Sequence, residues 1–272
     1  MVRTFKAIRL FNHILLGLVL LLLTGAFWNN GTRFVKATKQ WWLCRITRLM
    51  NMEIEVLGAF PARGNTGMLF VSNHISWTDI PVIGGLTQLN FLSKAEVKNW
   101  PLVGRLANCT GTLFIQRGSG DANRVSRQIA QYLHDGRSVL FFPEGTSTEG
   151  KTVARFHRKL FHASEHVTTQ VCPVTLHYSV EGFDHNPVAF VGNDEFASHI
   201  WKLLAFDKIK VTVAVLEPRL LDPAQLDVQV SQIRSDITQQ LESLHARQRI
   251  STSARWPDAS SPAGRQDEAA SF

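Results

Sequence analysis

Two residues five positions apart, His74 and Asp79, have the types and spacing best suited to chemistry in this chain. They follow an apolar run at residues 68–71 that predicts a short buried strand, so both should lie on the loop that leaves it. Imidazole is the usual general base near neutral pH. A carboxylate on the second ring nitrogen would fix the tautomer and stabilise the imidazolium that forms. No protein nucleophile is evident beside the pair, which leaves a hydroxyl of the substrate as the attacking group.

Spacing alone does not decide the role of this pair. The chain contains ten histidines, so a loop histidine near a helix-capping aspartate also arises by chance. Two further groups follow predicted strands. Glu144 and Gly145 come after apolar residues 138–142 and either hold a polar substrate or form an ordinary turn. Arg117 ends the stretch 111–117, just after a predicted strand at 111–115, and either binds a phosphate or carboxylate or lies on the surface.

Residues 145–152 introduce an alternative of another class, because they match the G-x4-G-K-[ST] pattern of a phosphate-binding loop. Pro143 and Glu144 separate the preceding strand from the first glycine, and no clear long helix follows. A nucleotide hydrolase is therefore the weaker interpretation. A basic group at Arg155, Arg158 and Lys159 follows this segment, and its alternative is a solvated helix face.

The N-terminal segment predicts a membrane anchor. Residues 10–28 are almost unbroken apolar sequence, near the minimum that spans a bilayer, and they follow Arg3, Lys6 and Arg9. A small-x-small cleavage site is poorly formed, so we expect a retained anchor, either one spanning helix or a deeply inserted one. Positive charge on both sides leaves its orientation open.

A basic and aromatic segment follows the anchor, and its composition favours lipid over nucleic acid as the partner of this chain. The net charge of +7 would suit either polyanion. The basic residues cluster beside the apolar anchor, however, as expected for a protein at an anionic lipid surface. They are Arg33, Lys36, Lys39, Arg45 and Arg48, interleaved with Phe34, Trp41, Trp42 and Leu43.

The rest of the chain alternates between predicted strands and helices, which indicates an α/β fold. We expect a single sandwich domain around a mostly buried mixed sheet, with the N-terminal membrane-anchoring helical element attached. The divisions are an anchor at 1–50, a catalytic domain at 51–250 and a disordered tail at 251–272. Predicted helices include 99–107, 121–135 and one from 222 onward. Three scattered cysteines suggest neither a disulfide framework nor a metal site.

Four short motifs, taken in order, resemble the blocks of the glycerolipid acyltransferase family. The blocks are Asn-His-x4-Asp at 73–79, a strand ending in Phe-Ile-x-Arg at 114–117, Phe-Pro-Glu-Gly-Thr at 142–146, and a Val/Ile-Pro-Val segment at 172–174. Here Cys172 precedes Pro173 where the family usually has Val or Ile. Four motifs in order are far more specific than any one of them, and together they cover roughly residues 70–180.

The resemblance assigns roles to individual residues. It implies that His74 is the base and that Asp79 orients it. It implies that the acyl acceptor is bound by the remaining residues of the blocks and that no metal takes part. These substrate-binding residues are Asn73, Arg117, Glu144, Gly145, Thr146 and Pro173, with Pro173 shaping the site. It also implies a two-helix N-terminal membrane element.

The same resemblance implies the reaction. An acyl group moves from a thioester, acyl-CoA or acyl carrier protein, to the free hydroxyl of a lysolipid at the bilayer, with no further cofactor. The first expectation for the acceptor is 1-acyl-glycerol-3-phosphate. Ser147 stands where many members have an arginine, and residues 148–151 with 155–160 look more like relatives that acylate lyso-ornithine lipid, which is the alternative.

The resemblance also implies a bacterial inner membrane location, with the catalytic domain facing the cytoplasm. Two alternatives remain within the same fold. A hydrolase would use water as the acceptor and release free fatty acid. A catalytically inactive membrane-binding protein would show no thioester-dependent turnover, although the intact His74–Asp79 pair argues against it.

Overall fold

The computed structural model describes residues 2–62, 66–116 and 120–255. The strands are β1 (Met52–Leu57), β2 (Leu69–Ser72), β3 (Asn90–Lys94), β4 (Leu113–Ile115), β5 (Val139–Phe141), β6 (Gln170–Ser179), β7 (Ile209–Val215) and β8 (Arg219–Leu220). The helices are α1 (Val2–Leu23), α2 (Arg33–Leu49), α3 (Asp79–Leu86), α4 (Val103–Cys109), α5 (Ala122–His134), α6 (Phe196–Leu203) and α7 (Leu226–Arg255). Three 3-10 segments are η1 (Ala95–Asn99), η2 (Arg158–Glu165) and η3 (Pro223–Gln225).

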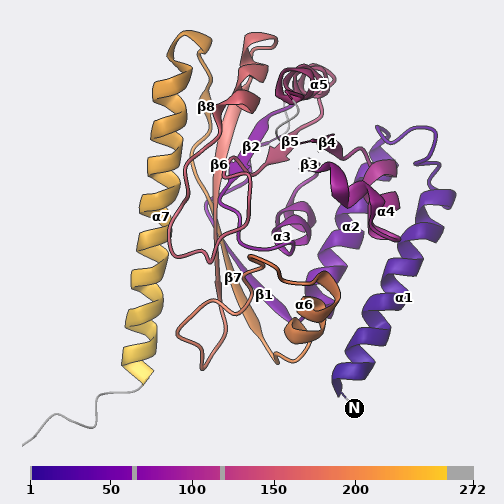
Figure 1. The fold of residues 1–272 in the computed structure, drawn as a ribbon, viewed down its shortest axis with the longest axis vertical. Helices are drawn as coiled ribbons and strands as arrows, with labels where there is room; N and C mark the ends of the chain where they lie inside the picture. The colour runs from indigo at the N-terminus through magenta and orange to yellow at the C-terminus, as the bar shows by residue number, and fades with distance from the viewer. Residues whose placement is uncertain (1, 63–65, 117–119, 256–272) are drawn as a thin grey trace, which may run out of the picture.

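The strands form one eight-stranded mixed sheet with helices on both faces (Figure 1). Their order is β1-β7-β6-β2-β5-β3-β4, and β8 pairs with β6. From β6 to β4 all neighbours are parallel, whereas β6 runs antiparallel to β7 and β8. The predicted α/β class is therefore confirmed.

Two apolar cores lie on opposite faces of the sheet. One face is covered by α2, α3 and α6, and the other by α5, α7 and η2. Helix α7 shows why, because its apolar residues recur at steps of three and four and form a single buried stripe. This stripe consists of Leu226, Val230, Ile233, Ile237, Leu241 and Leu244. Strand β6 is buried along nearly its whole length, as expected for a strand at the centre of the sheet.

The N-terminal helix differs from the predicted span at residues 10–28. Helix α1 is already formed at Val2, the first described residue, and its basic start is held against the domain: the Arg3 guanidinium donates to the Trp201 carbonyl, and Lys6 Nζ donates to the Phe206 carbonyl at 3.1 Å. It ends at Leu23, just before Gly25 takes a φ of +68°. The prediction was therefore wrong at both ends, although the apolar helix itself exists.

Other elements also differ from the predictions. The helix expected at 99–107 is split into η1 and α4, because Leu102 adopts a φ of +61° between them. The short elements α6, η2 and β8 were not predicted. Helix α7 continues to Arg255, into the segment expected to be a tail, and residues 256–272 lie outside the described residues.

The parallel strands place their carboxyl ends at one edge of the sheet, where sites of open α/β folds usually form. His74 follows the end of β2, and Glu144 follows the end of β5. Lys94 is the last residue of β3. Strand β6 passes beside β2 with Ser72 opposite Val174, so its later residues lie alongside the loop that follows β2.

Candidate active site

The loop between β2 and α3 wraps around one carboxylate. Asp79 is fully buried at the start of α3, and its Oδ2 accepts a hydrogen bond from His74 Nδ1 at 2.7 Å. The same oxygen accepts from the backbone N–H groups of Ile75 at 2.8 Å and Ser76 at 3.1 Å. The predicted His74–Asp79 hydrogen bond is thus present. The five-residue spacing lets the chain turn so that both side chains meet.

This geometry fixes the chemistry available to His74. A carboxylate only accepts hydrogen bonds, so Nδ1 carries the proton and Nε2 is left to accept one. The imidazole stacks on Phe142 with ring centroids 4.0 Å apart and planes 11° apart. The His74 side chain is 22% exposed and lines a cavity, whereas the aspartate behind it is sealed from solvent. A base with one accessible nitrogen therefore faces the cavity.

A second buried carboxylate holds the backbone of the same loop. Glu144 Oε1 accepts from the His74 N–H at 2.6 Å, and Oε2 accepts from the Ala154 N–H at 2.7 Å. Burial raises the pKa of Glu144, and the two N–H donors oppose that rise. The predicted acceptor-binding carboxylate therefore ties two loops together, although it also lines the cavity with Gly145 and Thr146.

Two of the predicted acceptor-binding residues, Asn73 and Pro173, do not line the cavity. Asn73 is buried and pairs with the backbone of Leu176, donating to its carbonyl at 2.9 Å and accepting from its N–H at 2.8 Å. Pro173 lies within β6 opposite Val71, inside the sheet. Both shape the strand ends from which the His74 loop leaves. Burial also raises the pKa of the neighbouring Cys172 thiol to about 12, so this cysteine acts as a packed apolar residue.

Two remaining residues of the family blocks have different outcomes. Arg117 lies outside the described residues, while Gln116 and Gly120 on either side of it line the cavity. Ser147, in the place of the family's arginine, donates its hydroxyl to the Phe190 carbonyl. The expected charge at this position is therefore replaced by a loop contact.

The sequence analysis missed one buried contact of the pair. Tyr178 on β6 donates its hydroxyl to Asp79 Oδ1 at 2.7 Å. Its position gave a weak signal, because a tyrosine in a buried strand needs a partner for its hydroxyl. The sequence could not say which partner, because 99 positions separate the two residues.

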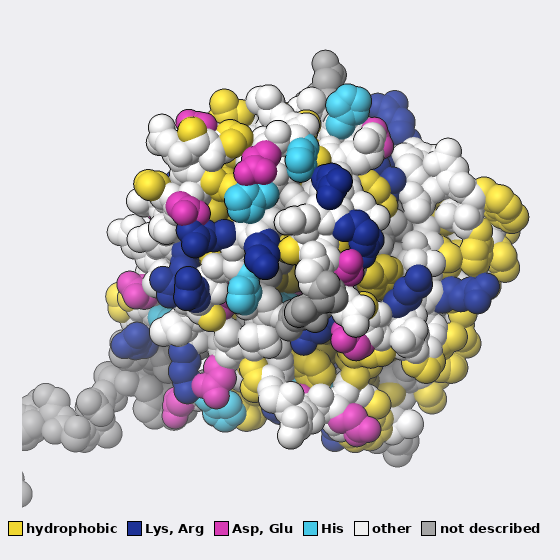
Figure 2. Space-filling view, turned by 45° about the horizontal axis from the view of Figure 1, so that its top comes forward, with side chains coloured by type: hydrophobic (Ala, Val, Ile, Leu, Met, Phe, Trp, Pro, Cys, Tyr) yellow, Lys and Arg dark blue, Asp and Glu magenta, His cyan; other side chains and the backbone are white. Residues whose placement is uncertain are grey.

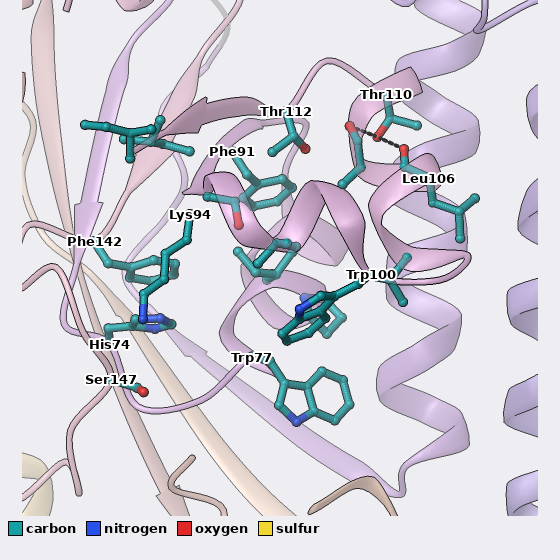
Figure 3. A pocket seen from close by; sticks show the side chains of 18 of the residues that line it. His74, Trp77, Phe91, Lys94, Trp100, Leu106, Thr110, Thr112, Phe142 and Ser147 are labelled. Atoms are coloured by element: carbon teal, nitrogen blue, oxygen red, sulfur yellow. Dashed lines mark hydrogen bonds between the residues drawn. The ribbon is translucent and has the colours of Figure 1, made fainter. Parts of the chain in front are cut away.

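An apolar cavity of about 1360 Å³ extends from His74 toward the N-terminal helices. Figure 3 shows His74, Phe142 and Ser147 on one side, Trp77 and Trp100 between, and Leu106 on the opposite side. Side chains of α1 and α2 complete the apolar wall. They include Leu10, Ile14, Leu21, Trp42, Leu43 and Ile46. The cavity is large and apolar enough to hold an alkyl chain with one end beside His74.

Basic side chains gather where the cavity meets solvent. Arg155, His157 and Lys159 are exposed and line it, and Arg158 there forms an ion pair with Asp227. Figure 2 shows lysine, arginine and histidine side chains concentrated over this face of the molecule. The arrangement offers mainly positive charge to a polar group held at the opening, with the carboxylate of Asp227 beside it.

The phosphate-binding loop suggested by residues 145–152 is not formed. Residues 151–157 contain no α-helix, and Lys151 pairs with Glu149 at 2.7 Å on the surface. Thr148 instead donates to the His74 carbonyl through its N–H at 2.8 Å and its hydroxyl at 3.2 Å. The loop thus binds the carbonyl of His74, while Glu144 binds its N–H, and the nucleotide hydrolase interpretation is wrong.

Comparisons with known proteins agree with this geometry. The family model described as Acyltransferase matches residues 52–177. A lyso-ornithine lipid O-acyltransferase of Pseudomonas aeruginosa is 42% identical over 196 residues, 71% of this chain and 75% of that protein. This chain belongs to the acyltransferase family. The acyltransferase is also 28% identical to a 1-acyl-sn-glycerol-3-phosphate acyltransferase of Neisseria gonorrhoeae, over 60% of this chain and 64% of that one.

The fold of this acyltransferase has a solved counterpart. The crystal structure of the 1-acyl-sn-glycerophosphate acyltransferase PlsC from Thermotoga maritima aligns with a TM-score of 0.63. The alignment covers 90% of this chain and 98% of that one at 17% identity. At this identity the match shows the shared fold and carries no substrate information.

The N-terminal helices give the acyltransferase an apolar outer surface, consistent with association with a membrane. In the described part of the chain, α1 alone is long and apolar enough to cross a bilayer. Its exposed side chains continue onto α2, and Figure 2 shows apolar side chains along the edge where α1 lies in Figure 1. They include Phe5, Ile8, Phe11, Leu15, Val19, Trp28, Phe34 and Trp41.

One basic residue expected at the lipid surface is turned inward. Lys39 of α2 is half-buried, and its ammonium donates to the carbonyls of Leu89 at 2.6 Å and Thr110 at 3.2 Å. Burial lowers the pKa of Lys39 to about 7, and nearby Arg137 and Lys36 add to the effect. Lys39 therefore fastens α2 to the domain.

Proposed function

We propose that this acyltransferase moves a fatty acyl group from a thioester to the free hydroxyl of a lysolipid held at the membrane. The observation that carries the proposal is the His74 base, oriented by buried Asp79, at one end of an apolar cavity. An acyl chain in that cavity would bring a reacting group beside Nε2. Orientation of this kind, with general-base catalysis, accounts for much of the rate of such reactions.

The step balances without a covalent acyl-enzyme. His74 Nε2 takes the proton of the acceptor hydroxyl as its oxygen bonds to the thioester carbonyl carbon. Asp79 stabilises the imidazolium that forms. The carbon–sulfur bond then breaks, and the thiolate leaves with the proton from His74. The products are an ester and the free thiol of coenzyme A or acyl carrier protein, and no cofactor enters the balance.

For the acceptor, we now favour lyso-ornithine lipid over 1-acyl-glycerol-3-phosphate, which the sequence placed first. The relative at 42% identity supports this order. The serine at position 147, where many family members have an arginine, also supports this order. An ornithine head group carries a carboxylate and an ammonium in place of a phosphate dianion, so it needs less positive charge. At the cavity opening, Arg155 would bind the carboxylate, and Asp227, which forms an ion pair with Arg158, would turn to the ammonium.

We further propose that α1 and α2 insert into one leaflet of a bacterial inner membrane from the cytoplasmic side. The inner side of α1 packs against the domain at Leu10, His13, Gly17 and Leu21, and its basic start is bound to α6. A helix crossing the bilayer could not keep these contacts without carrying α4 and α6 into the lipid. Shallow insertion retains them all and leaves the domain in reach of soluble thioesters.

An acceptor screen with purified protein tests the function. Lyso-ornithine lipid, 1-acyl-glycerol-3-phosphate and lysophosphatidylcholine are each supplied with acyl-CoA and acyl carrier protein thioesters. We expect thiol release to depend on an acceptor and to be fastest with lyso-ornithine lipid. Free fatty acid released without an acceptor would indicate a hydrolase instead.

The matched variants are His74→Ala and His134→Ala. The turnover rate of His74→Ala should be lower by at least about 10²–10⁴-fold, which is the usual contribution of a general base. His134 is exposed at the end of α5, and its replacement should change nothing. Near-normal turnover by folded His74→Ala protein would exclude the mechanism.

A further inference from the structure

The His74–Asp79 pair has a third member that comes from a distant strand. Tyr178 on β6 is 3% exposed, and its hydroxyl lies 2.7 Å from Asp79 Oδ1. Asp79 Oδ2 serves His74 and two backbone N–H groups. The two carboxylate oxygens are therefore divided, one toward the base and its loop and one toward the tyrosine.

The donor and acceptor of each hydrogen bond between Thr78, Tyr178 and Asp79 can be assigned. The Asp79 carboxylate only accepts, so the Tyr178 hydroxyl donates to it. Burial, and after it the neighbouring Asp79 charge, raise the pKa of Tyr178 well above its usual value, so the proton stays on the phenol. The Thr78 hydroxyl in turn donates to the Tyr178 oxygen at 3.2 Å. A chain of hydroxyls thus runs from Thr78 through Tyr178 to the carboxylate.

We infer that Tyr178 is a positioning residue that sets how strongly Asp79 holds the protonated form of His74. This inference rests on the proposed role of His74 as the base. A donor on Oδ1 draws carboxylate charge away from Oδ2, and in a site sealed from water such a bond counts strongly. The hydrogen bond therefore moderates the pull on the imidazolium and keeps more of the imidazole in the neutral form that can accept a proton.

Tyr178 also restrains the carboxylate mechanically. It is fixed by its own strand, whose Leu176 backbone pairs with Asn73 just before the base. Strand β6 therefore holds both sides of the His74 loop, Asn73 at its start and Asp79 at its end. Removing the tyrosine hydroxyl leaves a buried carboxylate oxygen without its donor and lets the carboxylate turn.

Other titratable groups surround His74 and stay constant between variants. Glu144 binds its backbone N–H, and Lys94, Arg155 and His157 line the same cavity. His199 on α6 lies behind Trp77, whose indole N–H donates to it at 3.1 Å. A change that follows loss of one tyrosine hydroxyl is therefore assigned to that hydroxyl.

The decisive experiment compares Tyr178→Phe with Tyr132→Phe. These are the two tyrosines of the chain, and Tyr132 of α5 packs under the Arg137 guanidinium, away from the pair. The titration of His74 is followed by NMR on histidine-labelled protein without substrate and is assigned by its loss in His74→Ala. In Tyr178→Phe the titration midpoint should move to higher pH, and in Tyr132→Phe it should not move.

Kinetics give the second readout. In Tyr178→Phe, kcat should fall by roughly tenfold to a hundredfold, the range for a hydrogen bond to a buried charge, while the KM values for donor and acceptor stay unchanged. The acid limb of kcat/KM should move to higher pH with the NMR midpoint. A loss of kcat without either shift would reduce Tyr178 to a packing residue and overturn the inference, as would a change confined to KM.

Thr78→Val keeps the inference testable if Tyr178→Phe does not fold. It removes the upstream donor only, so both shifts should have the same direction and a smaller size. An unmoved midpoint in Thr78→Val, with Tyr178→Phe unfolded, would overturn the inference. If wild-type protein acylates no acceptor, the proposed function fails, while the NMR titration still decides the role of Tyr178.

Discussion

Glu144 is the residue that joins the two halves of the site. Its oxygens accept from the N–H groups of His74 and Ala154, which belong to loops 80 positions apart. A glutamine could keep one of these bonds, but its amide NH₂ would face the other N–H donor. The charge itself therefore contributes to the geometry of the base, at the cost of burying a carboxylate.

Replacing Glu144 by glutamine makes that cost measurable. A carboxyl group whose pKa is raised in the folded state favours folding while protonated, and this stabilisation is lost as the pH rises through the folded pKa. Relative to Glu144→Gln, the wild-type thermal midpoint should therefore fall as pH rises from the ordinary glutamate value of 4.5. Thermal unfolding in detergent between pH 4.5 and 8 measures the slope. Glu242→Gln, exposed on α7, should show no such slope, and equal slopes for both variants would contradict the prediction.

At this scale the sequence was informative wherever partners are close along the chain. His74 and Asp79 are five positions apart, so their type and spacing predicted their hydrogen bond. Asn73 and Leu176 are 103 positions apart, and no local pattern could distinguish a substrate contact from a strand contact. Tyr178 and Asp79 are 99 positions apart, so their contact could not be predicted either.

At the scale of elements, the crossing of α1 and α2 shapes one end of the cavity. His13 Nε2 bonds to the Trp42 carbonyl at 3.0 Å, and Trp42 Nε1 donates to the His13 carbonyl at 2.9 Å, with the rings stacked at 5.3 Å. Gly17 lies one turn further along. A Cβ on Gly17 would sit 2.9 Å from Trp42 and 3.0 Å from Leu106. The wall there has no spare space.

Gly17→Leu should consequently shorten the space for an acyl chain. Figure 3 places Leu106 on the side of the cavity opposite His74, so the added side chain would fill the distal end. Each methylene that can no longer be buried costs about 0.8 kcal/mol, nearly fourfold in rate. We expect kcat/KM to fall steeply for the longest thioesters and little for short ones. Competition among acyl-CoAs of graded length measures this, and a uniform loss would instead indicate damage to the helix packing.

The elements themselves were predictable where a periodic apolar pattern ran long. Helix α7 and strand β6 are examples. The break in the helix at Leu102 could not be predicted, because it depends on how closely Gly104 packs against the preceding segment. A Cβ on Gly104 would lie 2.3 Å from the Lys98 carbonyl. Helix α6, only eight residues long, owes its position to tertiary contacts, among them the basic start of α1.

At the scale of the whole molecule, apolar exposure is concentrated on one side. Phe11 and Val19 of α1 are 53% and 48% exposed, and α7 stands on the opposite side of the sheet (Figure 1). If the helix lies in one leaflet, the exposed face of α1 would contact the lipid acyl chains. The length of the apolar run could not separate spanning from insertion, because that depends on which face the domain covers.

Placing glutamates at Phe11 and Val19 should therefore detach the protein from vesicles. The double variant is expected to lose sedimentation with anionic liposomes and turnover on lysolipid in bilayers. It should retain turnover on lysolipid in detergent micelles, because His74 is untouched. Val228→Glu is the control, since Val228 is 70% exposed on α7 and should leave liposome binding unchanged. Retained sedimentation by the double variant would rule out this lipid-facing surface.

The contacts of α1 have a consequence for substrate choice. Arg3 and Lys6 fasten its start to the far end of α6, and His13 locks its middle to Trp42. These contacts join α1 to the domain that carries His74. If α1 lies in one leaflet, as proposed, its depth would set the height of His74 above the lipid midplane, and only hydroxyls at that height would be within reach. Two lysolipids with identical head groups would then be told apart by how deep each hydroxyl sits, a form of discrimination that requires no contact with the head group.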